Sequence, residues 1–179
     1  MHKILPIFII FPIMVLIFGL KKKSSFFKFA IYLAFVFIFI MSEVGADYEA
    51  YKGIFVSIGD GQSFSSIHGE IGFLLVVKLF NLFGISYEMF RIIFLSVSLG
   101  IMCYYVNKMS PNFALSFFIL FLGYIAYMVS AYRQMLTMAL MLGSVYHTAY
   151  TRRYKKAMLF SLVGTFMHIS GVVGIHLYY

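Results

Sequence analysis

Long apolar runs alternate with short polar or charged segments along this chain, and the lengths of the runs predict its architecture. A helix needs about 20 mostly apolar residues to cross the hydrocarbon core of a bilayer, with a range of roughly 17 to 25. Runs that approach this length cover residues 4–20, 26–41, 92–106, 113–130, 134–149 and 157–178. The pattern predicts an all-α polytopic membrane protein with about six transmembrane helices.

The composition supports a membrane protein and excludes an ordinary soluble domain. Hydrophobic residues make up 63% of the chain and charged residues 11%, whereas about a quarter of a soluble domain is charged. The net charge of +8 does not indicate a nucleic-acid partner, because the basic residues stand in short loops beside apolar runs and act there as topology signals. Cys103 is the single cysteine, so no intrachain disulfide and no cysteine metal cluster is predicted.

The distribution of charge predicts the orientation of the chain. The two basic loops are "KKKSSFFK" at 21–28 and "TRRYKK" at 151–156, and the positive-inside rule places both on the cytoplasmic side. All six acidic residues lie between Glu43 and Glu88. We therefore expect the segment 42–91 to lie outside.

A further apolar run at 71–84 is predicted to lie in or on the membrane without crossing it. A crossing there would move the "TRRYKK" loop to the outer side, against its charge. The run is also short and contains Lys78 and Asn81, as a re-entrant or interfacial helix does. Residues 1–179 thus form a single transmembrane domain with six crossings and one such helix.

Ionisable residues near the outer surface are the candidates for chemistry, since charges in hydrocarbon are costly. Arg133 begins the fifth crossing, His168 lies in the outer half of the last one, and Asp47 and Glu70 stand in the outer segment. For Arg133 the alternative is snorkelling to lipid headgroups, with the hydroxyls that follow it bonded within their own helix. For His168 the alternative is a structural hydrogen bond between helices. The predicted topology nevertheless brings all four to one side of the membrane.

Carboxylates, an arginine and a histidine at one interface suit glycosyl transfer from a lipid-linked sugar. A cation stabilises the departing phosphate or pyrophosphate, and a carboxylate or imidazole accepts the proton of the attacking hydroxyl. The sequence has no D-x-D motif, no H-E-x-x-H motif and no histidines at ligand spacing. It therefore predicts neither a metal site nor a cofactor.

Four short motifs resemble the EpsG-type family of bacterial polysaccharide polymerases, which are Wzy-like multi-pass proteins. They are "GADYEAY" at 45–51, "HGEIGF" at 68–73, "YRQMLTMAL" at 132–140 and "FMHISGVV" at 166–173. Each motif alone is weak, but their order, spacing and intervening hydropathy are considerably more specific. The resemblance covers nearly all of the chain from about residue 41.

This resemblance implies a glycosyltransferase on the outer face of the bacterial inner (plasma) membrane. Its substrates would be oligosaccharide repeat units carried on undecaprenyl pyrophosphate, joined into O-antigen, capsule or exopolysaccharide, and its fold would resemble lipid-donor membrane glycosyltransferases. Other polysaccharide assembly proteins are candidate partners.

The resemblance also implies roles for individual residues. The family's acidic positions, its arginine and its histidine carry over as the catalytic residues Asp47, Glu70, Arg133 and His168. The substrate-binding residues are then Arg133, Gln134 and Tyr51, which shares a helical face with Asp47 at a spacing of four.

Members of this family usually continue through more crossings after the histidine motif, so we expect the chain to be an amino-terminal portion or a truncated member. A transporter or flippase of lipid-linked glycans is the main alternative, but it should show polar residues in both membrane halves and often an inverted repeat. The inner-half polar residues are mostly Ser and Thr, and no repeat is visible. The third hypothesis for the function of the chain is a non-catalytic assembly or inhibitory membrane protein.

Overall fold

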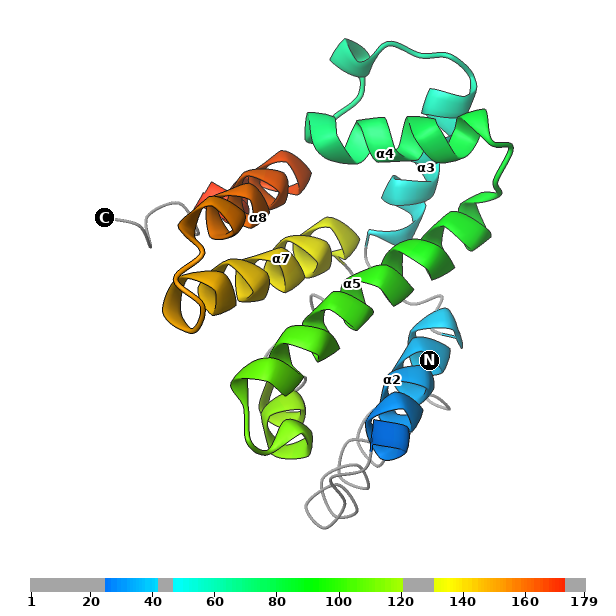
Figure 1. The fold of residues 1–179 in the computed structure, drawn as a ribbon. Coiled ribbons are helices and arrows are strands. Elements are labelled where there is room, and N and C mark those ends of the chain that lie inside the picture. The colour runs from blue at the N-terminus through cyan, green and yellow to red at the C-terminus, as the bar shows by residue number, and fades with distance from the viewer. Residues whose placement is uncertain (1–24, 42–46, 121–130, 173–179) are drawn as a thin grey trace.

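The computed structural model of the protein describes residues 25–41, 47–120 and 131–172, and their regular elements are all helical, as predicted (Figure 1). The elements in chain order are α2 (Ser25–Met41), α3 (Tyr48–Gly59), the 3-10 helix η1 (Phe64–Ser66), α4 (Ile71–Leu82), α5 (Tyr87–Met109), α7 (Tyr132–Ala149) and α8 (Tyr154–Met167). Helical turns also cover 113–120 and 169–172. The predicted first crossing, 4–20, lies outside the described residues.

Helix α5 is the longest described element and links the two ends of the molecule. An 18-residue window within its 23 residues has a mean hydropathy of 1.8, and at 1.5 Å per residue the helix is about 35 Å long, enough to cross a bilayer core of about 30 Å. Ser86 caps the first turn, because its hydroxyl accepts a hydrogen bond from Met89 N at 3.4 Å. Among the described residues, α5 alone is both long and apolar enough to span. The total of six crossings stays a prediction.

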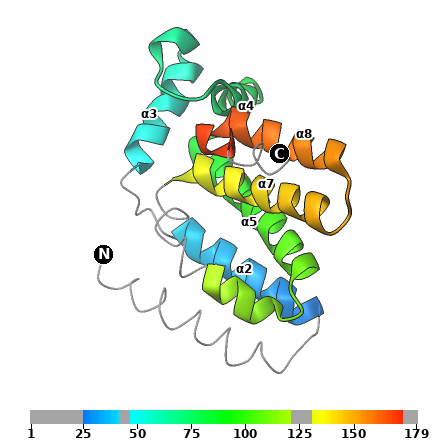
Figure 2. The same cartoon turned by 90° about the vertical axis from the view of Figure 1, so that its left-hand side faces the viewer.

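Helices α7 and α8 pack side by side through small and polar residues, and α7 also packs along α5 (Figure 2). Ser144 Oγ lies 2.8 Å from Ser161 Oγ, and Thr137 Oγ1 donates to the Gly164 carbonyl at 3.2 Å. Helix α8 therefore approaches α7 closely through small residues, as helices in membranes often do. The hydroxyls of Thr137 and Ser144 bond to α8, so they do not serve only their own helix.

The last helix ends earlier than predicted. The apolar run 157–178 predicts one continuous crossing, but α8 ends at Met167, and His168 has the extended backbone angles φ −161° and ψ 138°. The chain then turns back on α8, since a Cβ on Gly171 would lie only 2.3 Å from Thr165 N. His168 therefore does not continue the helical face that Ser161 and Thr165 share.

Helices α3 and α4 lie at the same end of the molecule as the start of α5. Helix α4 packs on α3 and also contacts α8, and it runs across the end of the α7 and α8 pair (Figure 1). At the crossing the backbones are close, because a Cβ on Gly72 would lie 2.4 Å from the Phe166 carbonyl oxygen. The run 71–84 is thus helical as expected, and its placement on the membrane stays a prediction.

The start of α2 and the end of α7 both contact the other end of α5. Lys28 Nζ donates to Asn107 Oδ1 at 2.5 Å, and the Tyr150 hydroxyl donates to the Met109 carbonyl at 3.5 Å. The start of α2, the end of α5 and the turn after α7 are therefore neighbours. All the described carboxylates lie between residues 47 and 88, and the two that pair with arginines, described below, lie at the opposite end.

Candidate functional site

An ion pair between Glu70 and Arg133 forms the centre of the candidate site. Glu70 directly precedes α4, and Arg133 is the second residue of α7. A guanidinium nitrogen of Arg133 donates to Glu70 Oε2. The Arg133 side chain is 21% exposed and the Glu70 side chain 25%, so the pair is half-buried yet open to solvent. Residues 63 positions apart thus meet at one point.

His168 completes the cluster from the end of α8. Its Nε2 atom lies 3.7 Å from Glu70 Oε1 and 3.4 Å from the Gln134 side-chain amide. On the other side of the ring, Ser170 N donates to His168 Nδ1 at 3.2 Å. The Nδ1 atom is therefore occupied by a backbone donor, while Nε2 faces the Glu70 carboxylate and the Gln134 amide.

Aromatic rings hold the Arg133 guanidinium from the side. Its Cζ atom lies 5.5 Å from the centre of the Tyr51 ring and 5.5 Å from that of Phe73, within the range of a cation–π contact. Arg133 Nε also donates to the Tyr51 hydroxyl at 3.5 Å, and the Tyr51 ring stacks on Tyr132 at 4.8 Å. An arginine that only extended toward lipid headgroups would need none of these partners, so the contacts favour a preorganised binding site.

Asp47 is the predicted catalytic residue that the structure does not bring into this cluster. It caps α3 and is exposed, and its side chain makes no capping hydrogen bond. Its carbonyl accepts from Tyr51 N at 2.9 Å, so Asp47 stands one helical turn before a residue that contacts Arg133. The cluster itself consists of Glu70, Arg133, His168, Tyr51 and Gln134.

Arg91 is a second arginine beside the site, and the sequence analysis did not single it out. Its side chain is 3% exposed and Nε lies 3.2 Å from Glu88 Oε2. Its guanidinium lies 5.4 Å from the centre of the Tyr48 ring and is hydrogen-bonded to the Tyr132 side chain. Arg91 is therefore connected to the cluster through Tyr132 and Tyr51. The signal was present, because Arg91 also stands at the head of an apolar run, as Arg133 does.

An apolar groove of about 360 Å³ opens beside Glu70. Apart from Glu70 and Thr165 its lining is hydrophobic, with Leu162 and Phe166 of α8 among the lining residues. Among the described residues, no group of three or more metal-ligating side chains occurs. The arrangement offers a cation for an anionic group, a carboxylate and imidazole for a proton, and an apolar surface beside them.

Comparison with known proteins identifies a family. The EpsG family model matches residues 24–179. No curated protein and no solved structure matches the chain.

Proposed function

Because the chain belongs to the EpsG family and is thus a membrane protein related to polysaccharide biosynthesis, we propose that it is a polymerase of lipid-linked glycans. In this proposal it joins oligosaccharide repeat units carried on undecaprenyl pyrophosphate into O-antigen, capsule or exopolysaccharide. In the same proposal it works on the outer face of the bacterial inner membrane, with the acidic end of the molecule on that face. The bilayer and the lipid-linked glycans are its partners.

The meeting of Glu70, Arg133 and His168 carries this proposal. An acceptor hydroxyl attacks the anomeric carbon of the donor, a new C–O bond forms, and the bond from that carbon to the pyrophosphate oxygen breaks. The leaving pyrophosphate keeps the electron pair, and a guanidinium close to it stabilises the developing charge. The hydroxyl proton passes to a carboxylate or imidazole. Arg133 supplies the cation, and Glu70 with His168 supplies the proton acceptor.

The resting ion pair gives the substrate a second role. While Arg133 is bound to Glu70, the guanidinium and the carboxylate occupy each other in an ion pair. A pyrophosphate carries more charge than one carboxylate and competes for the guanidinium. Once Arg133 turns to the pyrophosphate, the close polar partner that Glu70 keeps among the described residues is His168, at 3.7 Å. Binding of the donor thus releases the base that the reaction needs.

Polymer length in cells that depend on this chain for polymerisation tests the proposal. Loss of one charge-stabilising donor costs about a hundredfold or more in rate, so Arg133→Ala and Glu70→Gln should leave mostly single repeat units. Lys155→Ala is the matched control, because Lys155 is exposed and belongs to the basic loop. A wild-type distribution of polymer lengths from both site variants, at equal protein levels in the membrane, refutes the catalytic assignment.

A further inference from the structure

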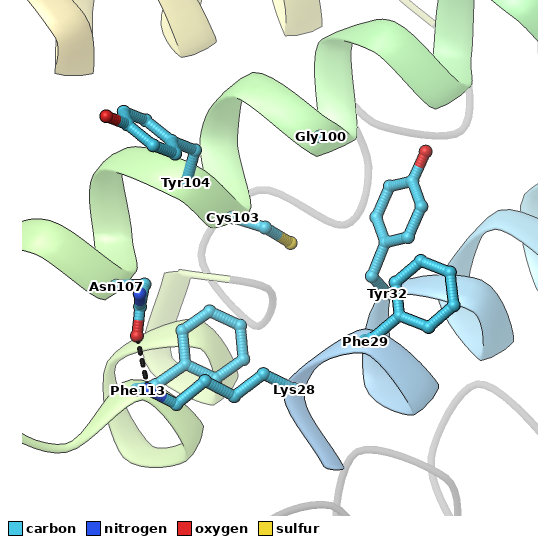
Figure 3. A pocket seen from close by; sticks show the side chains of 8 residues that line it. All are labelled: Lys28, Phe29, Tyr32, Gly100, Cys103, Tyr104, Asn107 and Phe113. Carbon is cyan, nitrogen blue, oxygen red and sulfur yellow. Dashed lines mark hydrogen bonds between the residues drawn. The ribbon is translucent and has the colours of Figure 1, made fainter. Parts of the chain in front are cut away.

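A second cavity lies at the basic end of the molecule, far along α5 from the candidate site. It has a volume of about 330 Å³ and is bounded by α2, α5 and the helical turns at 113–120 (Figure 3). Phe29 and Tyr32 of α2, Cys103 of α5 and Phe113 are among the residues that line it. Gly100 leaves the wall of the cavity open, because a Cβ there would reach only the Tyr32 ring, at 3.7 Å.

One end of this cavity is cationic while the rest is largely apolar. Lys28 Nζ is held at its edge by the hydrogen bond to Asn107 Oδ1 (Figure 3), and it lies 5.9 Å from the centre of the Phe113 ring. Lys108 stands next to Asn107, with its Nζ 5.6 Å from the centre of the Tyr104 ring. Within 25–41, 47–120 and 131–172, neither lysine has a carboxylate within ion-pairing distance. The cavity therefore combines an unneutralised positive charge with an aromatic, apolar interior.

We propose that this cavity binds an anionic phospholipid, with the phosphate at Lys28 and part of one acyl chain among the aromatic rings. The volume is within the range of small-ligand sites, roughly 300 to 1,000 Å³. Basic pockets between helices on the side of the membrane that carries the positive loops suit anionic headgroups. Charge decides the class of lipid, because a zwitterionic headgroup brings no net negative charge to Lys28. The site is independent of the proposed polymerase activity.

The absence of tryptophan from the chain makes the site testable by fluorescence. A Phe29→Trp variant carries a single tryptophan at the cavity wall, and bromine atoms on an acyl chain quench it only at short range. The variant is placed in vesicles that contain brominated phosphatidylglycerol or brominated phosphatidylcholine. One lysine near an anionic headgroup favours binding about fivefold, so we expect the anionic lipid to quench at about one fifth of the concentration that the zwitterionic lipid needs. A Leu75→Trp variant, on the exposed face of α4, should show no such preference.

Variants of the cavity then distinguish a specific site from general lipid contact. Lys28→Gln in the Phe29→Trp background should remove the preference, and Lys28→Arg should keep it. Gly100→Leu should also abolish the preferential quenching, because it fills the cavity and leaves Lys28 in place. Equal quenching by the two lipids, or a preference that survives Lys28→Gln, overturns the proposal. Quenching at Phe29→Trp by neither lipid also overturns it, since protein would then occupy the cavity.

Discussion

Replacing Glu70 and Arg133 by alanine, separately and together, measures how strongly the ion pair stabilises the fold. Two unit charges at 4 Å interact by about 4 kcal/mol at the effective dielectric constant of 20 that applies near a protein surface. Exposed pairs contribute only about 0 to 1 kcal/mol, whereas breaking a buried pair costs about 3 to 5 kcal/mol. With side chains 21% and 25% exposed, this pair lies between these limits. We expect each single substitution to cost about 2 kcal/mol.

The double variant should cost clearly less than the sum of the two single variants. Each single substitution leaves one charge half-buried without its partner, and the double substitution leaves neither. The expected coupling free energy is about 1 to 2 kcal/mol. Equilibrium unfolding of the purified protein in detergent, measured for all four forms, gives this value. Strictly additive effects, with a coupling below about 0.3 kcal/mol, would show that the pair does not hold α4 to α7 and would refute the reasoning.

Two further substitutions test how the site is held in place. Gly72→Ala should lower stability by about 1 to 3 kcal/mol, because the new Cβ would lie 2.4 Å from a backbone oxygen of α8. Gly53→Ala is the control, since a Cβ at Gly53 meets nothing within 4 Å. Equal melting temperatures for the two variants would contradict the prediction. Arg91→Met should lower the stability of the fold by about 1 to 3 kcal/mol and also shorten the polymer, because the hydrogen bond to Tyr132 is lost. Lys52→Met, at an exposed site, is the control. Equal melting temperatures for these two variants would contradict the prediction.

Hydropathy predicted the helices well where a helix depends on burial and poorly where it depends on local hydrogen bonds. The run 92–106 marks the centre of α5, but the helix extends from Tyr87 to Met109 because Ser86 caps it. In the last helix the opposite occurs, because the apolar run continues to residue 178 although α8 ends at Met167. There the His168 side chain accepts a hydrogen bond from Ser170 N and lies 3.0 Å from the Ser170 hydroxyl, and such local bonds compete with the helix. A hydropathy value averaged over a window of residues does not detect these local hydrogen bonds.

Three of the four predicted catalytic residues meet in space because each stands at the end of a helix. Glu70 precedes α4, Arg133 opens α7 and His168 follows α8, so the topology that brings these ends together also brings the side chains together. Asp47 caps α3 at the same end, but its side chain makes no hydrogen bond or ion pair with the described residues of the cluster. Arg91 was missed for a related reason. It stands at the edge of the outer segment, where an arginine is ordinarily interpreted as a surface charge, yet it is buried against Tyr48.

The cations at the two ends of the molecule differ in how they are paired. At the acidic end, Arg91 pairs with Glu88 and Arg133 with Glu70, so neither adds net charge to that side. At the basic end, Lys28 and Lys108 contact aromatic rings and no described carboxylate. The positive-inside rule counts Lys and Arg and is little affected by carboxylates, so the predicted orientation rests on the two basic loops, which hold eight of the 14 lysines and arginines. In the proposed function, the pairing of Arg133 with a single carboxylate leaves its guanidinium open to exchange with a more highly charged anion such as pyrophosphate.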